Sequence, residues 1–250
     1  MDNLNELCIN TDGSVETLTN HNTLLTNIKF DKAEAYFKNL EMSLIEKIRD
    51  NSDGFIFGSV AWLTSEKIID ALSLCNNVQI LIQKEDFLRP DYCDNLNEKQ
   101  RRLRYRRLYS KLKFVHDRYD CGAPICNLSV CGDPSVDPVR CVGNNNSDQK
   151  KAMPRAHNKF LVFCKTIKSS SMDTRMKGEN IYVPVAVWTG SFNFTWNAER
   201  SFENAIYLED KSGQNPIINS YLKEHHQIFA LSEPLDWEHE WTEPEYRVGT

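Results

Sequence analysis

The sequence predicts an α/β fold with a mixed, largely parallel sheet flanked by helices on both faces. Segments with apolar residues at helical spacing alternate with short apolar runs that are typical of buried strands. Residues 55–82 have the pattern of a strand, a helix and a second strand, which implies a parallel pair joined by a right-handed crossover. The chain has 250 residues, which is enough to bury a substantial core.

Four elements are expected in the first third of the chain. Apolar spacing predicts a helix over residues 32–48 that Asp31 would cap, and an apolar run predicts a strand over residues 55–63. Ser65 is a suitable N-cap for the short helix that follows. The apolar run at residues 78–82 then completes the strand–helix–strand unit.

The second half of the chain is expected to consist mainly of strands. Residues 120–148 contain turn-forming residues and four cysteines, and are expected to be mostly loop. Residues 217–231 are expected to form a closing helix that ends before Pro234. The strands expected in this half cover residues 137–142, 160–163, 183–188 and 205–208.

Composition excludes several classes of protein. With 40% hydrophobic and 26% charged residues, 10 Gly and 9 Pro, the chain is neither collagen-like nor wholly disordered. No apolar run reaches the length of a membrane span, and the first residues lack the features of a secretory signal. We therefore expect a cytoplasmic protein without stable membrane insertion. Its eight cysteines then indicate a reducing compartment.

Charge is unevenly distributed along the chain, although the net charge is only −5. Residues 98–118 contain nine basic and two acidic residues, a net +7, and are expected to form a helix with exposed arginines. Such a helix is either an ordinary solvated face or a surface that contacts nucleic-acid phosphates. Residues 233–250 form an acidic tail. The candidate substrate-binding arginines are Arg101, Arg102, Arg104, Arg106 and Arg107.

The residues that best indicate chemistry lie between positions 155 and 210. His157 and Lys159 flank one residue at the start of an expected strand, so alternation places both side chains on the same side. The sequence Gly190-Ser191-Phe192-Asn193 follows another strand, and Glu203 precedes a third. Each of these elements is common alone, but chance rarely supplies all of them at strand ends.

This combination resembles the phospholipase D superfamily, whose signature is His-x-Lys, four residues, Asp, and then Gly-Ser-x-Asn. It is most similar to small members with a single motif, the bacterial endonucleases and the mitochondrial cardiolipin hydrolase. The resemblance covers residues 30–232, which we expect to form one phospholipase D-like catalytic domain. Residues 1–29 would be an N-terminal extension.

Two features depart from the family pattern. Cys164 stands where the signature has Asp, and a thiol is a much weaker hydrogen-bond acceptor than a carboxylate. The stretch between Lys159 and Gly190 is also longer than in the compact motif. The additional residues, 165–180, are polar, and we expect them to form a surface hairpin or loop insertion. Asp173 lies within this insertion and could replace the missing carboxylate.

The resemblance implies a metal-independent phosphodiesterase in which His157 attacks phosphorus and forms a phosphohistidine, with no cofactor required. Lys159 and Asn193, assisted by Ser191, would hold the non-bridging oxygens, and Glu203 would orient the histidine. A second histidine must protonate the leaving oxygen. Because the chain has one such motif, we expect a twofold homodimer that places both copies of His157 in one site.

Two further groups of residues allow alternative interpretations. Trp196 is either a stacking platform for a base or a core residue, and its place at a strand–helix junction slightly favours the core. The cysteines of the expected loop either bind a structural zinc or are free thiols, since their spacing differs from the usual zinc knuckles. The candidate zinc ligands are Cys121, Cys126, Cys131 and Cys141.

We therefore expect an endonuclease that cleaves DNA or RNA. One alternative is a catalytically degenerate nucleic-acid-binding module, which Cys164 favours. Another is a phospholipid hydrolase of the cardiolipin type. The sequence offers no apolar membrane-docking helix for that activity, and its acidic tail would be repelled by anionic lipid.

Overall fold

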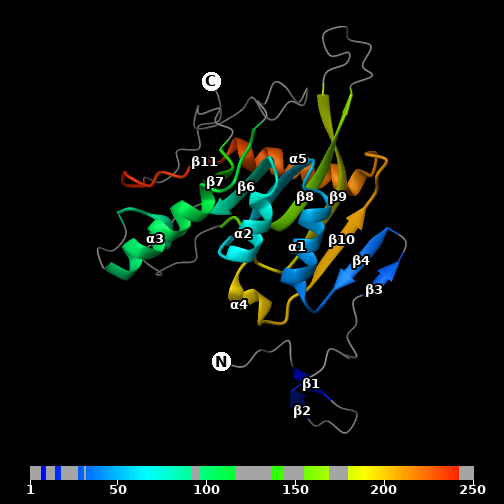
Figure 1. Cartoon of the computed structure of the whole chain (residues 1–250), viewed down its shortest axis with the longest axis horizontal. Helices are drawn as coiled ribbons and strands as arrows, with labels where there is room; N and C mark the ends of the chain where they lie inside the picture. The colour runs from blue at the N-terminus through cyan, green and yellow to red at the C-terminus, as the bar shows by residue number, and fades with distance from the viewer. Residues whose placement is uncertain are drawn as a thin grey trace.

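The computed structural model describes residues 7–9, 15–17, 28–30, 32–91, 96–115, 137–143, 155–168 and 180–241 (Figure 1). The main body has three layers, with one nine-stranded sheet between two layers of helices. A separate two-stranded antiparallel sheet consists of β1 (Leu7–Ile9) and β2 (Val15–Thr17).

The large sheet has the strand order β11-β7-β6-β5-β8-β9-β10-β4-β3. β5, β6 and β7 run parallel to one another, whereas every other neighbouring pair is antiparallel. The strands are β3 (Ile28–Phe30), β4 (Ala33–Tyr36), β5 (Phe55–Val60), β6 (Asn77–Gln83), β7 (Val139–Val142), β8 (Lys159–Lys168), β9 (Asn180–Gly190), β10 (Ala205–Glu209) and β11 (Glu233–Pro234).

The sheet is mixed, as predicted, but it is mostly antiparallel, so the prediction of a largely parallel sheet was wrong. The strand–helix–strand unit does give the expected parallel pair of β5 and β6. β8, β9 and β10, however, are consecutive along the chain and adjacent in the sheet, so the chain turns back at each connection. A parallel pair needs a crossover that returns the chain to its starting edge, and only the β5–β6 and β6–β7 pairs are connected in this way.

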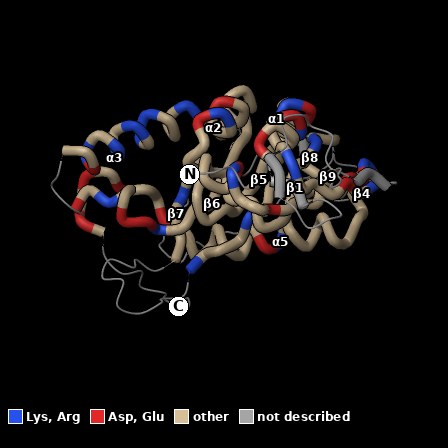
Figure 2. The backbone as a smooth tube through the Cα atoms, turned by 90° about the horizontal axis from the view of Figure 1, so that it is seen from below, with Lys and Arg blue, Asp and Glu red and all other residues tan. Residues whose placement is uncertain are grey.

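Helices cover both faces of the sheet, as predicted (Figures 1 and 2). On the face that carries most of the helices, the helices pack against the sheet through residues such as Leu44, Ile69 and Leu108. On the opposite face, α5 packs through Phe229 against side chains such as Val162. The helices are α1 (Leu40–Asp50), α2 (Glu66–Ser73) and α3 (Leu96–Tyr109) on the first face, α5 (Pro216–Ala230) on the second, and the short α4 (Trp196–Glu199) beside the sheet.

The segment 32–48 does not form one helix, contrary to the prediction. β4 occupies its first part and pairs with β10, and α1 begins only at Leu40, after Asn39 in the left-handed conformation (φ 54°). The apolar side chains before Asn39 fit either a helix or an alternating strand, and pairing with β10 decides between them. Asp31, the expected cap, lies outside the described residues.

Other predicted elements occur close to their expected positions. Ser65 caps α2, because its hydroxyl accepts a hydrogen bond from the backbone N–H of Ile68 at 3.3 Å. β8 and β9 remain paired as far as Lys168 and Asn180, so both ends of the expected insertion are strand. No helix in the described ranges combines the length and the apolar character needed to cross a bilayer.

Candidate active site

His157 and Lys159 lie where the chain enters β8, and their side chains meet. Lys159 pairs with Val60 at the end of β5. Its Nζ lies 3.0 Å from His157 Nδ1 and donates a second hydrogen bond to the His157 carbonyl at 2.7 Å. The alternation of strand side chains therefore brings these two groups together as expected.

The segment before β8 is held by a buried glutamine that the sequence patterns did not single out. Gln83, at the end of β6, accepts a hydrogen bond from the Ala156 N–H at 2.7 Å through Oε1 and donates to the Lys84 carbonyl through Nε2 at 2.8 Å. Gly143 makes room for this arrangement, because a Cβ there would lie 2.5 Å from Gln83 Oε1 and its φ is +93°. The backbone around His157 is thus anchored to β6.

The Asn193 loop reaches the same edge of the sheet from β9. The Phe194 N–H donates to the Trp62 carbonyl at 3.1 Å, and the Phe194 carbonyl accepts hydrogen bonds from the N–H groups of Thr64 and Ser65, both at 2.8 Å. Asn193 is almost fully buried, and its Oδ1 has no hydrogen-bond partner in the described part of the chain. An orphaned carbonyl oxygen of this kind is costly unless a partner arrives to satisfy it.

Glu203 is attached to the same loop through Ser191. The Ser191 hydroxyl donates a hydrogen bond to Glu203 Oε2 and accepts one from the Asn204 N–H at 3.0 Å. The negative charge of Glu203 also partly counteracts the lowering of the Lys159 pKa. Among the described residues, no hydrogen bond joins Glu203 to His157, so the orienting contact that the resemblance implies is absent from this conformation.

The electrostatic environment favours a neutral imidazole. Desolvation lowers the pKa of His157, and the positive charges of Lys159 and Arg155 lower it further. Burial also lowers the pKa of Lys159. A lysine ammonium has donors only, so His157 Nδ1 must act as the acceptor in their contact. The neutral ring then carries its proton on Nε2, whereas protonation of a leaving group would require the imidazolium form.

Cys164 is not directed toward this pair. Phe160, Val162 and Cys164 belong to the core beneath α5, whereas Leu161 and Phe163 face the opposite core. A register shift between Phe163 and Cys164 follows from a bulge in the pairing with β9. Burial raises the pKa of the Cys164 thiol well above its ordinary value. Asp173, the other carboxylate candidate, lies outside the described residues.

The candidate arginines lie along α3, a helix rich in basic residues (Figure 2). Most of them have acidic or aromatic neighbours. Arg104 pairs with Glu66 at 2.8 Å, and Arg106 pairs with Glu238 at 3.0 Å. Arg102 is buried, whereas Arg107 is exposed. Arg101 stacks on Phe87, with 4.3 Å from the guanidinium to the ring centre. These contacts hold α3 to its neighbours.

A cavity of about 250 Å³ lies beside α3. Its lining combines basic side chains with an aromatic ring from the C-terminal segment. The lining residues are Pro90, Lys99, Arg102, Leu103, Arg106 and Trp237.

Trp196 is a surface residue, so the slight preference for a core position was wrong. Its side chain is 61% exposed at the start of α4 and lies over the guanidinium of Arg200 at 4.5 Å. Thr195 caps this short helix, and Ala198 is the residue of the turn that faces the core. The strand–helix junction does pack against the body, but through Phe194 and Ala198.

The described part of the cysteine loop contains one of the four candidate zinc ligands. Cys141 lies in β7, where its thiol is 3.6 Å from the Glu233 carbonyl and 3.7 Å from the Pro234 carbonyl. Within the described ranges, no three His, Cys, Asp or Glu side chains are grouped to hold a metal ion. Cys141 is thus in contact with β11. The remaining candidates, Cys121, Cys126 and Cys131, lie outside the described residues.

No protein-family model matches the chain. It is 28% identical over 221 residues to the uncharacterized protein L381 of Acanthamoeba polyphaga mimivirus, covering 85% of this chain and 70% of that protein.

Similar solved structures include Nuc of Salmonella typhimurium, described as a phospholipase D family member (15% identity, TM-score 0.41), and NucT of Helicobacter pylori (13% identity, TM-score 0.42). Each likeness covers 80% of this chain and 97% of the other chain. TrmBL2, described as an archaeal chromatin protein with a novel mode of DNA binding, is a third (12% identity, TM-score 0.36, covering 84% and 56%).

Proposed function

We propose that the protein is a metal-independent phosphodiesterase, an endonuclease that cleaves DNA or RNA through a phosphohistidine at a site shared by two chains. The contact between His157 and Lys159 carries the proposal. At the same edge of the sheet, the Asn193 carbonyl oxygen has no partner among the described residues, and Ser191 is hydrogen-bonded to Glu203. A nucleophile, a cation and polar groups at one edge of the sheet are what phosphoryl transfer without a metal needs.

The proposed reaction uses His157 in two protonation states. In one chain, the phosphate oxygens draw Lys159 away from His157 Nδ1, the ring proton moves to Nδ1, and the freed Nε2 lone pair attacks phosphorus. In the partner chain, His157 acts as the imidazolium, the form that the bound phosphate favours; its Nε2–H gives its proton to the leaving oxygen as the P–O bond breaks, which leaves a neutral ring. Water then displaces the histidine from phosphorus, and its proton passes to the partner's imidazole. Atoms and charge balance over the two steps.

Cys164 gives little support to the degenerate alternative. Its thiol is fully buried on the far side of the strand from Lys159. Replacement of the signature carboxylate therefore leaves the contact between His157 and Lys159 in place. Binding without cleavage stays a measurable outcome, and so does hydrolysis of a phospholipid.

The test is cleavage of labelled single-stranded DNA, duplex DNA, RNA and cardiolipin vesicles in excess EDTA. We expect a nucleic acid to be cut, and we expect His157→Ala to reduce the rate by about 10³-fold or more. His239→Ala is the matched control, because His239 is exposed and pairs with Asp236 in the C-terminal segment. Turnover of lipid alone would replace the nuclease proposal, and binding without cleavage would leave only the degenerate module.

The shared site predicts dominant inhibition. After subunit exchange with an excess of His157→Ala chains, most wild-type chains would have an inactive partner, so activity per wild-type chain should fall toward zero. Independent sites would keep that activity constant. Light scattering on the same samples gives the second readout, and an active, strictly monomeric protein would contradict the dimer.

A further inference from the structure

An exposed tryptophan lies across from His157 at the entrance to β8. β5 and β8 are antiparallel, with Val60 opposite Lys159, and the Ala61 N–H extends the ladder by donating to the Asn158 carbonyl at 3.1 Å. The same register, continued by one residue, sets Trp62 opposite His157. Residues that are directly opposite in an antiparallel pair project their side chains on the same face.

The backbone of Trp62 also contacts the other half of the site. Its carbonyl accepts the hydrogen bond from the Phe194 N–H at 3.1 Å, next to Asn193. The following residue, Leu63, forms a parallel bridge with Phe194. Trp62 is therefore the residue at which the segment carrying His157 and the loop carrying Asn193 meet.

The indole ring is exposed yet held in place. Its side chain is 37% exposed, and its Nε1–H donates to Glu85 Oε1 at 2.8 Å. Glu85 is largely shielded from solvent and also pairs with Arg155 at 3.5 Å. Burial raises the pKa of Glu85, although Trp62 and Arg155 act in the opposite direction. A ring fixed in this way loses little conformational entropy when a ligand covers it.

We infer that a base of the substrate stacks on Trp62 and that the substrate is single-stranded nucleic acid, an inference that rests on the proposed function. A base can cover the indole only if it has left its own stack, which a single strand permits at little cost. The cationic groups of Arg155 and Lys159 lie at the same edge as His157, so a phosphate next to that base would meet the reacting groups. Glu85 is a positioning residue that acts through the indole.

The test compares a short labelled single strand with an otherwise identical strand of abasic residues and with the duplex. Binding is measured by fluorescence anisotropy in EDTA, and cleavage is measured on the same strands. We expect wild-type protein to prefer the strand with bases over both others. Trp62→Ala should weaken binding and raise KM for that strand by roughly 5- to 150-fold, the range for one stacked base. Affinity for the abasic strand should not change.

Two further variants separate stacking from a structural role. Trp62→Phe keeps an aromatic ring and should retain much of the preference for bases, whereas Glu85→Leu should lose part of it with Trp62 still present. Leu74→Ala is the control, because Leu74 is 65% exposed at the C-terminal end of α2. It should bind all strands like the wild type.

Several outcomes would overturn the inference. Equal losses on the strands with and without bases would make Trp62 a structural residue, and an unchanged affinity would remove it from the interface. Equal wild-type affinity for duplex and single strand would overturn the substrate class. Tighter binding to anionic vesicles that depends on Trp62, without any preference for bases, would assign the ring to a membrane surface. Absence of cleavage with base-dependent binding intact would count against the proposed function alone.

Discussion

At the scale of single residues, two carboxyl groups share a proton behind the site loop. Glu41 of α1 is buried and accepts hydrogen bonds from Ser65 Oγ at 2.5 Å and from Lys67 Nζ at 2.7 Å. Burial opposes its ionisation, but hydrogen bonds from Glu199, Lys67 and Ser65 lower its pKa overall. Burial and the hydrogen bond with Glu41 raise the pKa of Glu199 to about 7. The proton therefore belongs mainly to Glu199, on α4.

This pair predicts a dependence of stability on pH. Between pH 4.5, the ordinary pKa of Glu199, and about pH 7, the folded chain keeps a proton that the unfolded chain has lost. The contribution of Glu199 to the free energy of unfolding should therefore fall as pH rises through this window. Glu199→Gln, which imitates the protonated form, should remove that decline. Urea unfolding of both proteins at several pH values in this window measures the decline. An equal change of the free energy of unfolding with pH in both proteins would contradict the prediction.

The contact between His157 and Lys159 could be anticipated from the sequence, but the partners of Glu203 and Trp62 could not. Residues two positions apart in an extended chain project on the same face, whatever the rest of the fold is. The contact from Ser191 to Glu203 and the position of Trp62 opposite His157 depend on loop geometry and on strand register. Register is set by pairing between distant segments, which one sequence does not reveal.

At the scale of elements, β7 is joined to the C-terminal segment by a buried arginine. Arg140 is fully buried, and it donates from Nε to Ser232 Oγ and from a terminal nitrogen to the Ser232 carbonyl, both at 2.8 Å. Its guanidinium also lies 5.1 Å from the centre of the Phe229 ring. One side chain of β7 thus holds the end of α5 and the start of β11.

Replacing this arginine should destabilise the fold. Arg140→Met keeps a long apolar side chain but removes the donors to Ser232, so we expect a loss of about 2–4 kcal/mol in the free energy of unfolding. Chemical denaturation measures the loss. Arg49→Met is the matched control, because Arg49 is exposed on α1, and it should change stability by less than about 0.5 kcal/mol. Equal effects of the two substitutions would show that the Ser232 contacts contribute little.

The elements that the sequence predicts best are those whose signal is local. The strand–helix–strand unit has a cap, apolar runs and a helix between them, and β5, α2 and β6 follow that pattern. The four residues of β4 carry too little local information, and their partner β10 lies far along the chain. The direction of most strands in the sheet likewise follows from how the chain connects them, which periodicity does not encode.

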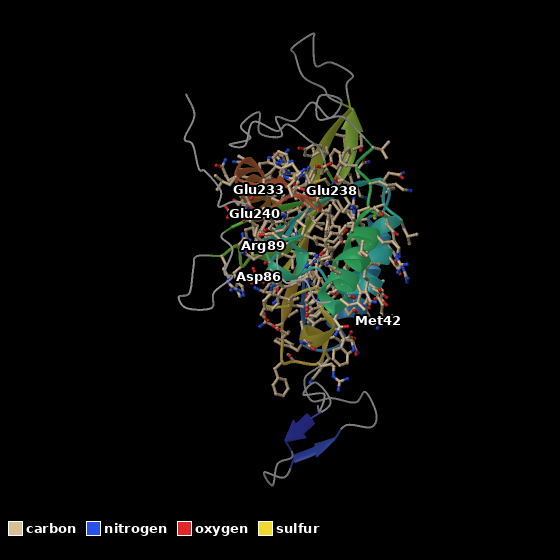
Figure 3. All side chains as sticks on the ribbon, turned by 90° about the vertical axis from the view of Figure 1, so that its left-hand side faces the viewer. Met42, Asp86, Arg89, Glu233, Glu238 and Glu240 are labelled. Carbon is tan, nitrogen blue, oxygen red and sulfur yellow. The ribbon has the colours of Figure 1, made fainter. Side chains whose placement is uncertain are left out.

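At the scale of the whole molecule, part of the expected acidic tail belongs to the folded body. β11 pairs with β7, Trp241 is buried, and Glu238 pairs with Arg106 of α3. In Figure 3, Glu233 and Glu240 lie along the same side of the molecule as Arg89 and Asp86. The Trp241 N–H contacts Asp91 at 3.4 Å, which connects the two segments. The acidic residues up to Glu240 therefore cannot be treated as a free tail.

The two borders of the large sheet are formed by β3 and β11, which are its first and last strands in chain order. During synthesis, β5, β6 and β8 would emerge from the ribosome well before β11 does. Until residues 232–234 follow, β7 would have an open edge and Arg140 would lack its Ser232 acceptors. The edge of β7 can therefore be covered only late in translation. Until then, the nascent chain would expose a strand edge in the sheet that supports the site.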